Sequence, residues 1–282
     1  MCSKGKKVVI KTDVELDDYI DNLQKERARK SSEWSSPPQD GRMYDMIKMN
    51  MMMDSFDQPF TEATLRYHNR NNGQTVLHVA AKKGMIEMLQ QKISHKYLDA
   101  RDDMGKTSLF MAAQHGFDGI VERLIQLEAD PEIPTKKHKT PMYIAAKKDH
   151  LKVVILLAQS SVDINARTKN GQTPLMVAAK YGHCGIITRL ILSGADESLQ
   201  DCYDRTALSI AVVYGHVDVV KELLEMGASI NTTDLFGRTP LCIASERHDE
   251  ALISLLLKHD AKIDPAETHE NEMLLSLLSK IK

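Results

Sequence analysis

The sequence predicts a repeat solenoid, and three recurring features support that prediction. A motif that begins with threonine returns at intervals of 32, 33, 33, 33 and 33 residues. A glycine or another turn-forming residue lies two positions before each threonine and nine positions after it, and four of the repeats carry an alanine pair between these points. A period of this length indicates units that bury their apolar sides only against their neighbours. The six motifs are Thr75-Val76-Leu77-His78, Thr107-Ser108-Leu109-Phe110, Thr140-Pro141-Met142-Tyr143, Thr173-Pro174-Leu175-Met176, Thr206-Ala207-Leu208-Ser209 and Thr239-Pro240-Leu241-Cys242.

The motif Thr-Pro-Leu-His-x-Ala at a 33-residue period resembles the ankyrin repeat, over about residues 70 to 266. The resemblance implies an all-helical ankyrin-repeat solenoid, in which each repeat is a hairpin turn followed by two antiparallel helices. Apolar pairs such as Val153-Val154 and Ile186-Ile187 then belong to the core between repeats. The six predicted repeats span residues 72–101, 105–134, 138–167, 171–200, 204–233 and 237–266.

The two turn positions of each repeat suit residues that tolerate a positive φ, which is why glycine occupies most of them. The third repeat departs from this pattern at both positions, with His138 and Asp149. We therefore expect its turns to be more strained or more mobile than those of its neighbours.

Helical caps are expected at both ends, because a terminal repeat would otherwise expose its apolar side. The N-terminal cap is predicted over residues 43–71 and the C-terminal capping helix over residues 267–282. The N-terminal segment is rich in methionine, and a promiscuous Met-rich binding surface is an alternative interpretation of it.

Residues 1–42 are predicted to be a mostly disordered tail with one short amphipathic helix, in which Leu16, Tyr19, Ile20 and Leu23 share a face. That helix either docks into a partner or folds back onto the solenoid. The tail's acidic segment, residues 13–21, could also occupy a basic groove and inhibit it. The candidate phosphorylation sites of the tail are Ser31, Ser32 and Ser36.

Composition and motifs argue against an enzyme. The chain is 42% hydrophobic and 27% charged with a net charge of -2, which is typical of a soluble folded protein. Its four cysteines, Cys2, Cys184, Cys202 and Cys242, lack the spacing of a zinc site, and no nucleotide-binding or hydrolase motif is present. We expect no cofactor, no catalytic residue, no metal and no membrane span. The protein is expected in the cytoplasm, with the nucleus as a second compartment, and as a monomer.

The resemblance also implies where a partner binds: on hairpin tips and the exposed face of the first helix. These positions lie four, three and one residues before each threonine, and seven and eight after it. Lys or Arg fills 13 of the 30 positions and Asp or Glu only two. Aromatic and apolar residues join them toward the C-terminal end. The predicted partner-binding residues are Lys82, Lys83, Lys106, His115, Lys136, Lys137, Lys139, Lys147, Lys148, Lys169, Lys180, Tyr181, Tyr203, Arg205, Tyr214, Leu235, Phe236 and Arg238.

Three interpretations of this surface remain open. It binds an acidic or phosphorylated segment of a protein partner, which makes the chain a non-catalytic interaction module or adaptor. It binds nucleic acid, because basic residues among aromatic ones also suit phosphates and stacked bases. Or its lysines only keep the solenoid soluble.

A last prediction concerns modification. Asn165 and Asn231 occupy a hairpin position where ankyrin repeats often have asparagine. Leu157 and Asp163 precede Asn165 by eight and two residues, which resembles the context in which an asparaginyl hydroxylase modifies such repeats. Both asparagines are therefore candidate modification sites.

Overall fold

The computed structural model describes residues 72–90 and 93–263, all of which lie in the second of two compact units, His68–Lys282. The predicted N-terminal tail and both predicted caps lie outside these residues, as do Ser31, Ser32 and Ser36. The described residues form helices and turns, without a strand. No helix among them is long and apolar enough to cross a membrane.

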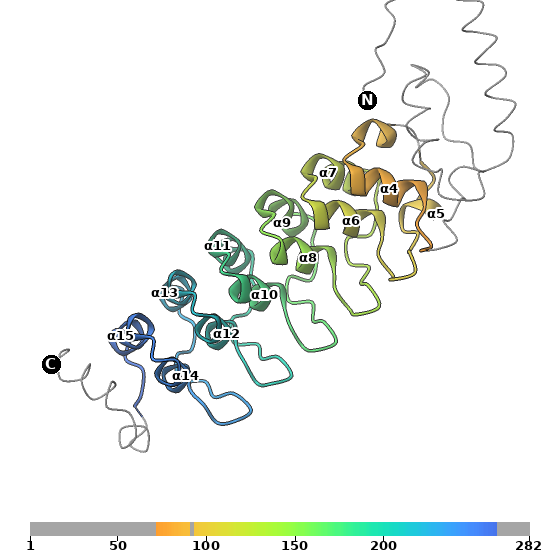
Figure 1. The fold of residues 1–282 in the computed structure, drawn as a ribbon. Coiled ribbons are helices and arrows are strands. Elements are labelled where there is room, and N and C mark those ends of the chain that lie inside the picture. The colour runs from red at the N-terminus through yellow and green to blue at the C-terminus, as the bar shows by residue number, and fades with distance from the viewer. Residues whose placement is uncertain (1–71, 91–92, 264–282) are drawn as a thin grey trace, which may run out of the picture. The chain divides into compact units, whose positions relative to one another are not determined.

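The helices form two rows, which Figure 1 shows with the hairpin loops projecting on one side. We call the helix that follows each motif threonine the inner helix and its antiparallel partner the outer helix. Each inner helix packs on the next inner helix, and the outer helices pack on one another in the same order. The inner helices are α4 (Val76–Lys83), α6 (Ser108–His115), α8 (Pro141–Lys147), α10 (Pro174–Tyr181), α12 (Ala207–Tyr214) and α14 (Pro240–Glu246). The outer helices from the second repeat onward are α7 (Asp118–Gln126), α9 (Leu151–Ala158), α11 (Cys184–Leu192), α13 (Val217–Glu225) and α15 (Glu250–Lys258).

The motif threonine determines where each inner helix begins. In α8, for example, the Thr140 hydroxyl oxygen accepts a hydrogen bond from the Tyr143 N–H at 3.2 Å. This bond satisfies one of the N–H groups that a helix leaves free at its start. Proline follows the threonine in α8, α10 and α14, where its missing N–H costs nothing. The repeated motif is therefore a helix start that is copied six times along the chain.

The expected positive φ is found at both turn positions of every repeat. Glycine supplies it at most of these positions, but His138, Asp204 and His248 each have a φ of 56° and Asp149 has a φ of 61°. The carboxylate of Asp149 lies 3.8 Å from Nδ1 of His183 in the next repeat, which offsets part of its backbone strain. The third repeat thus has a positive φ without glycine at both of its turns, while the greater strain or mobility of these turns stays a prediction.

The first repeat departs from the expected pair of helices. Its outer element is a short 3₁₀ segment, η1 (Ile86–Leu89), followed by a single turn, α5 (His95–Leu98). In the other repeats a leucine seventeen residues after the threonine anchors the outer helix, as Leu124 does in α7. The first repeat has Lys92 at this position. Without that leucine, the sequence offers too little apolar surface to hold a full outer helix against the core.

Alanine in place of Gly116 is expected to lower the free energy of unfolding by about 2–3 kcal/mol. Gly116 has a φ of 74°, and an added Cβ would lie 2.5 Å from Nδ1 of His150. The His150 ring would have to move away from the Gln114 carbonyl oxygen, which now lies 3.2 Å from its Nε2.

Gly194 provides the matched control, because its φ is 91° and an added Cβ would meet nothing within 4 Å. Alanine there adds only backbone strain, about 1 kcal/mol. Urea unfolding followed by circular dichroism measures both variants, and equal losses would contradict a packing role for His150.

Candidate functional site

The predicted binding positions form one surface, which we call the groove face. It comprises the residues four, three and one positions before each motif threonine and seven and eight after it. Within a repeat, the Lys106 ammonium donates to the Gln114 side-chain oxygen at 3.2 Å, which joins the hairpin to the last turn of the inner helix. Between repeats, the Lys136 N–H donates to the Met104 carbonyl oxygen at 3.0 Å, which joins one hairpin tip to the next. The stacked repeats therefore present these side chains side by side.

Lysines crowd the groove face of the third repeat. Burial lowers the pKa of Lys139, and the positive charges of Lys147, Lys137 and Lys106 lower it further. None of these lysines forms an ion pair within the part of the chain that the structure describes. The predicted lysines that are exposed are Lys82, Lys83, Lys136, Lys137, Lys148 and Lys169, while Lys106, Lys139, Lys147 and Lys180 are half-buried.

The positive potential extends to His115 in the second repeat. Burial lowers the pKa of its imidazole, and the nearby charges of Lys82, Lys106, His150 and Lys148 act in the same direction. The lysines of three successive repeats therefore act on one region of the groove face.

Aromatic rings alternate with the lysines toward the fourth and fifth repeats. The Lys147 ammonium lies 5.3 Å from the centre of the Tyr181 ring, and the Lys180 ammonium lies 5.9 Å from Tyr181 and 5.1 Å from Tyr214. Tyr181 and Tyr214 are both exposed. Burial raises the pKa of Tyr143 to about 12, and its hydroxyl donates to the Gln172 side chain at 3.1 Å. Cation–π contacts of this kind hold the long lysine side chains in place.

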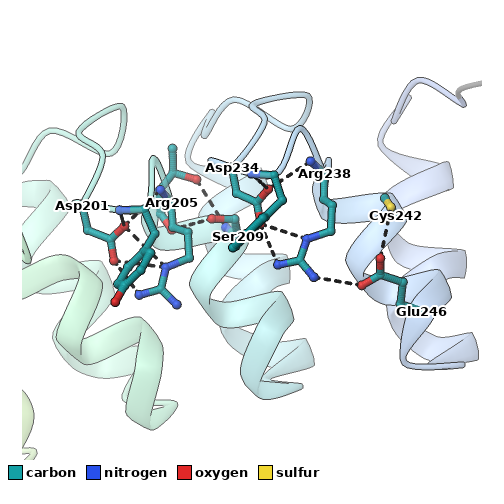
Figure 2. Close-up of polar contacts among 10 residues, drawn as sticks. Asp201, Arg205, Ser209, Asp234, Arg238, Cys242 and Glu246 are labelled. Carbon is teal, nitrogen blue, oxygen red and sulfur yellow. Dashed lines mark hydrogen bonds and ion pairs between the residues drawn. The ribbon is translucent and has the colours of Figure 1, made fainter.

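Two predicted binding cations are already paired within the chain, as Figure 2 shows. The guanidinium of Arg205 donates to the Asp201 carboxylate at 2.6 Å, and that of Arg238 donates to Asp234 at 2.8 Å. Both aspartate side chains are only 1% exposed. Arg238 also donates to the Glu246 carboxylate at 3.1 Å. The charges of Arg205 and Arg238 are thus largely neutralised, and these residues stabilise their hairpins.

A hairpin cation is neutralised where an aspartate five positions before the motif threonine is followed four residues later by an arginine. In the second repeat, which has Asp102 and Lys106 at these positions, the lysine ammonium donates to Gln114 instead. Asp201 and Asp234 carry an arginine four residues later. In the third repeat this position is Thr135, whose hydroxyl oxygen accepts a hydrogen bond from the Lys139 N–H at 3.1 Å. A threonine supports the turn without supplying a negative charge. The Asp-x-x-x-Arg spacing is visible in the sequence. That the two side chains form an ion pair became clear only from the geometry of the hairpin.

Acid is expected to weaken the sixth hairpin. Burial alone would raise the pKa of Asp234, but hydrogen bonds from the Arg238 side chain and from the N–H groups of Arg238 and Phe236 lower it below its ordinary value. The unfolded-state pKa is about 3.9, so the carboxylate contributes its full stability above about pH 4 and loses it as pH falls through the lower folded-state value.

The stability difference between the wild type and Asp234→Asn should therefore shrink below about pH 4. Urea unfolding at a series of pH values measures it. A difference that stays constant into strong acid would contradict the role of the charged carboxylate.

The C-terminal end of the groove face is apolar. Leu235 is 58% exposed and Phe236 is 72% exposed at the tip of the sixth hairpin. The Leu235 N–H donates to the Tyr203 carbonyl oxygen at 2.9 Å, which places the half-exposed Tyr203 beside them. The groove face thus has a basic half on the first four repeats and an apolar half on the last two. In the apolar half Arg205 and Arg238 are paired with carboxylates, and Arg247 donates to the Val213 carbonyl oxygen.

The two candidate hydroxylation sites lie between repeats. The side-chain oxygen of Asn165 accepts a hydrogen bond from the Asp196 N–H at 2.9 Å, and that of Asn231 accepts one from the Lys262 N–H at 2.9 Å. Each asparagine therefore joins its own repeat to the next. Their hydroxylation stays a prediction. Among the described residues, no group of His, Cys, Asp and Glu is arranged to hold a metal ion.

The stacked pairs of helices and their hairpins define a helical repeat protein. The model of the family described as ankyrin repeats (3 copies) matches residues 49–135, 118–201 and 175–267. The chain therefore belongs to the ankyrin-repeat family, which confirms the resemblance and the all-helical solenoid. The first match begins inside the segment predicted as an N-terminal cap. A comparison with curated proteins gives no match. Ankyrin repeats generally mediate protein–protein interaction and are typically non-catalytic.

Proposed function

We propose that the protein is a non-catalytic adaptor that binds an acidic or phosphorylated segment of a partner protein on its groove face. The observation that carries this proposal is the lysine cluster of the third repeat, defined as Lys136, Lys137, Lys139, Lys147 and Lys148. Within the described residues no carboxylate pairs with these lysines, although the chain as a whole has more acidic than basic residues.

Electrostatics makes this cluster suited to a polyanionic segment. Neighbouring like charges on a surface each cost a few tenths of a kcal/mol. The charges of Lys147, Lys137 and Lys106 add to the effect of burial in lowering the pKa of Lys139. A partner's carboxylates or phosphates would relieve that repulsion and would also speed the encounter. Single exposed ion pairs contribute only about 0.2–1 kcal/mol, so several must act together.

The apolar half of the groove face supplies the second part of the proposed interface. Phe236, Leu235 and Tyr203 expose rings and aliphatic groups that a partner can cover. Buried aromatic groups of this kind commonly contribute most of the affinity, while charges around them set specificity. We therefore expect a partner segment whose acidic part lies on the third repeat and whose apolar part reaches the fifth and sixth.

Nucleic acid is the second candidate ligand, and the alternation of Lys147, Tyr181, Lys180 and Tyr214 favours it. Cations at this spacing can contact phosphates while exposed rings stack on bases. The internal pairing of Arg205 and Arg238 argues in the other direction, because a nucleic-acid surface would gain from free arginines along its whole length. A protein partner therefore explains more of the surface.

Capture from cell lysate tests the proposal. The wild-type chain is compared with a variant in which the five lysines of the cluster become glutamate, after circular dichroism shows that both are folded. A protein retained by the wild type after nuclease treatment, and lost by the variant, is the expected result. Material that disappears after nuclease treatment would favour nucleic acid. Equal capture by both chains would overturn the proposal.

A further inference from the structure

A small pocket of about 260 Å³ opens on the groove face between the second and third repeats. Phe110 of α6 and Ile144 of α8 line its inner part, and both are almost fully buried. Met104, at the tip of the second hairpin, forms an apolar edge and is 54% exposed. The pocket therefore combines an apolar interior with access from the binding surface.

Positive charge surrounds this apolar interior. Lys106, Lys137, Lys139 and Lys148 all line the pocket, and none forms an ion pair within the described ranges 72–90 and 93–263. The Lys106 ammonium lies 5.7 Å from the centre of the Phe110 ring, close to the pocket interior. A side chain that enters the pocket would contact apolar groups in its interior and lysine ammonium groups at its rim.

One repeat further along, a hydrogen bond between two side chains spans the corresponding position. The residue equivalent to Phe110 is Tyr143, whose hydroxyl donates to Gln172 at 3.1 Å. Gln172 is also the residue equivalent to Lys139, and Asn170 and Tyr181 replace Lys137 and Lys148, so the rim there has three cations fewer. Phenylalanine lacks the hydroxyl that would reach the next hairpin, and the space between the second and third repeats stays open.

We propose that this pocket receives one apolar side chain of the partner, with acidic residues on both sides of it in the partner's sequence. The inference rests on the proposed function and makes it more specific. The volume is smaller than the roughly 300–1,000 Å³ of sites for whole small molecules, and so suits a single side chain. The four lysines at the rim complement carboxylates or phosphates that flank such a side chain. Met104 can adjust its side chain to fit the guest.

Two short synthetic peptides provide the probes. Both consist of glutamate residues around one central residue, which is leucine in one peptide and alanine in the other. Fluorescence anisotropy with the full chain at low ionic strength measures their affinities. We expect the leucine peptide to bind about tenfold more tightly, because only its central side chain fills the pocket.

Phenylalanine in place of Gln114 is designed to fill the pocket from within. Gln114 lines the pocket and is half-buried near the end of α6. Its counterpart in the fifth repeat is Val213, so this helix position tolerates an apolar residue. Gln114→Phe should remove the tenfold preference for leucine. Because it also removes the side-chain oxygen to which Lys106 donates, the affinity for the alanine peptide is measured alongside it. The matched control, Val213→Phe, should keep the preference.

The outcomes separate this inference from the proposed function. Equal binding of the two peptides, or a leucine preference that survives Gln114→Phe, would overturn the pocket assignment while the acidic-segment proposal stands. If neither peptide binds, the proposed function falls and the pocket assignment falls with it.

Discussion

Alanine in place of Asp201 is expected to lower the free energy of unfolding by about 3 kcal/mol. The carboxylate accepts hydrogen bonds from the N–H groups of Tyr203 and Arg205, at 2.9 and 3.1 Å, and from the Arg205 guanidinium. Its removal leaves these donors without an acceptor at a side chain that is 1% exposed. Because stability in a solenoid is distributed over the repeats, hydrogen exchange should rise first around the fifth hairpin.

Asp102 is the matched control for this prediction. Its carboxylate accepts hydrogen bonds from the Met104 and Lys106 N–H groups at 2.9 and 2.8 Å, as Asp201 does at its own hairpin. The side chain of Lys106 points to Gln114 instead, so no guanidinium is involved. Asp102→Ala should therefore cost only about 1–2 kcal/mol. Equal costs at Asp102 and Asp201 would mean that Arg205 adds no stability and is available to a partner.

Local rules made much of the fold predictable from the sequence. The start of a helix needs a capping residue such as threonine, and a tight turn needs a residue that accepts a positive φ. Both needs are local, so they can be recognised in the sequence of each repeat by itself. His138 and Asp149 illustrate this point, because their positions in the register predicted an unusual backbone and the structure has it. The single Lys92 at a leucine position also explains, after the fact, why the first outer helix is replaced by shorter elements.

The groove face was harder to predict, because its chemistry depends on contacts between positions. The register placed Arg205 and Lys139 at equivalent sites, yet the first is neutralised by Asp201 and the second is not. That difference comes from the residue at the hairpin base, which lies outside the groove face itself. The pocket between the second and third repeats likewise depends on a missing hydroxyl at Phe110, a residue that the repeat pattern assigns to the core. Counting charges along the register therefore overestimates the basic character of the last two repeats.

Reversal of the lysine cluster is expected to weaken binding of the groove partner by about 100-fold or more. Each of the five substitutions to glutamate removes an attraction of about 0.5–1 kcal/mol and adds a repulsion. The loss should be steepest at low salt and smaller at high salt, because exposed charges are screened. Isothermal titration with the captured partner at two salt concentrations measures the effect.

The same variant should be at least as stable as the wild type in the absence of a partner. The five glutamates repel one another about as much as the five lysines do, but they attract Lys106, Lys169 and Lys180, which lie on adjacent repeats and repel the wild-type lysines. If the lysines serve binding, the variant should lose affinity while its stability stays unchanged or rises slightly. If they serve folding, the variant should lose both stability and affinity.

A second variant controls for net charge alone. It reverses five exposed lysines that lie outside the groove face, namely Lys96, Lys152, Lys221, Lys258 and Lys262. The two variants change the net charge equally, so general repulsion of an acidic partner is the same for both. Only reversal within the groove face should abolish binding. Equal losses in the two variants would show that overall charge, and not the cluster on the third repeat, attracts the partner.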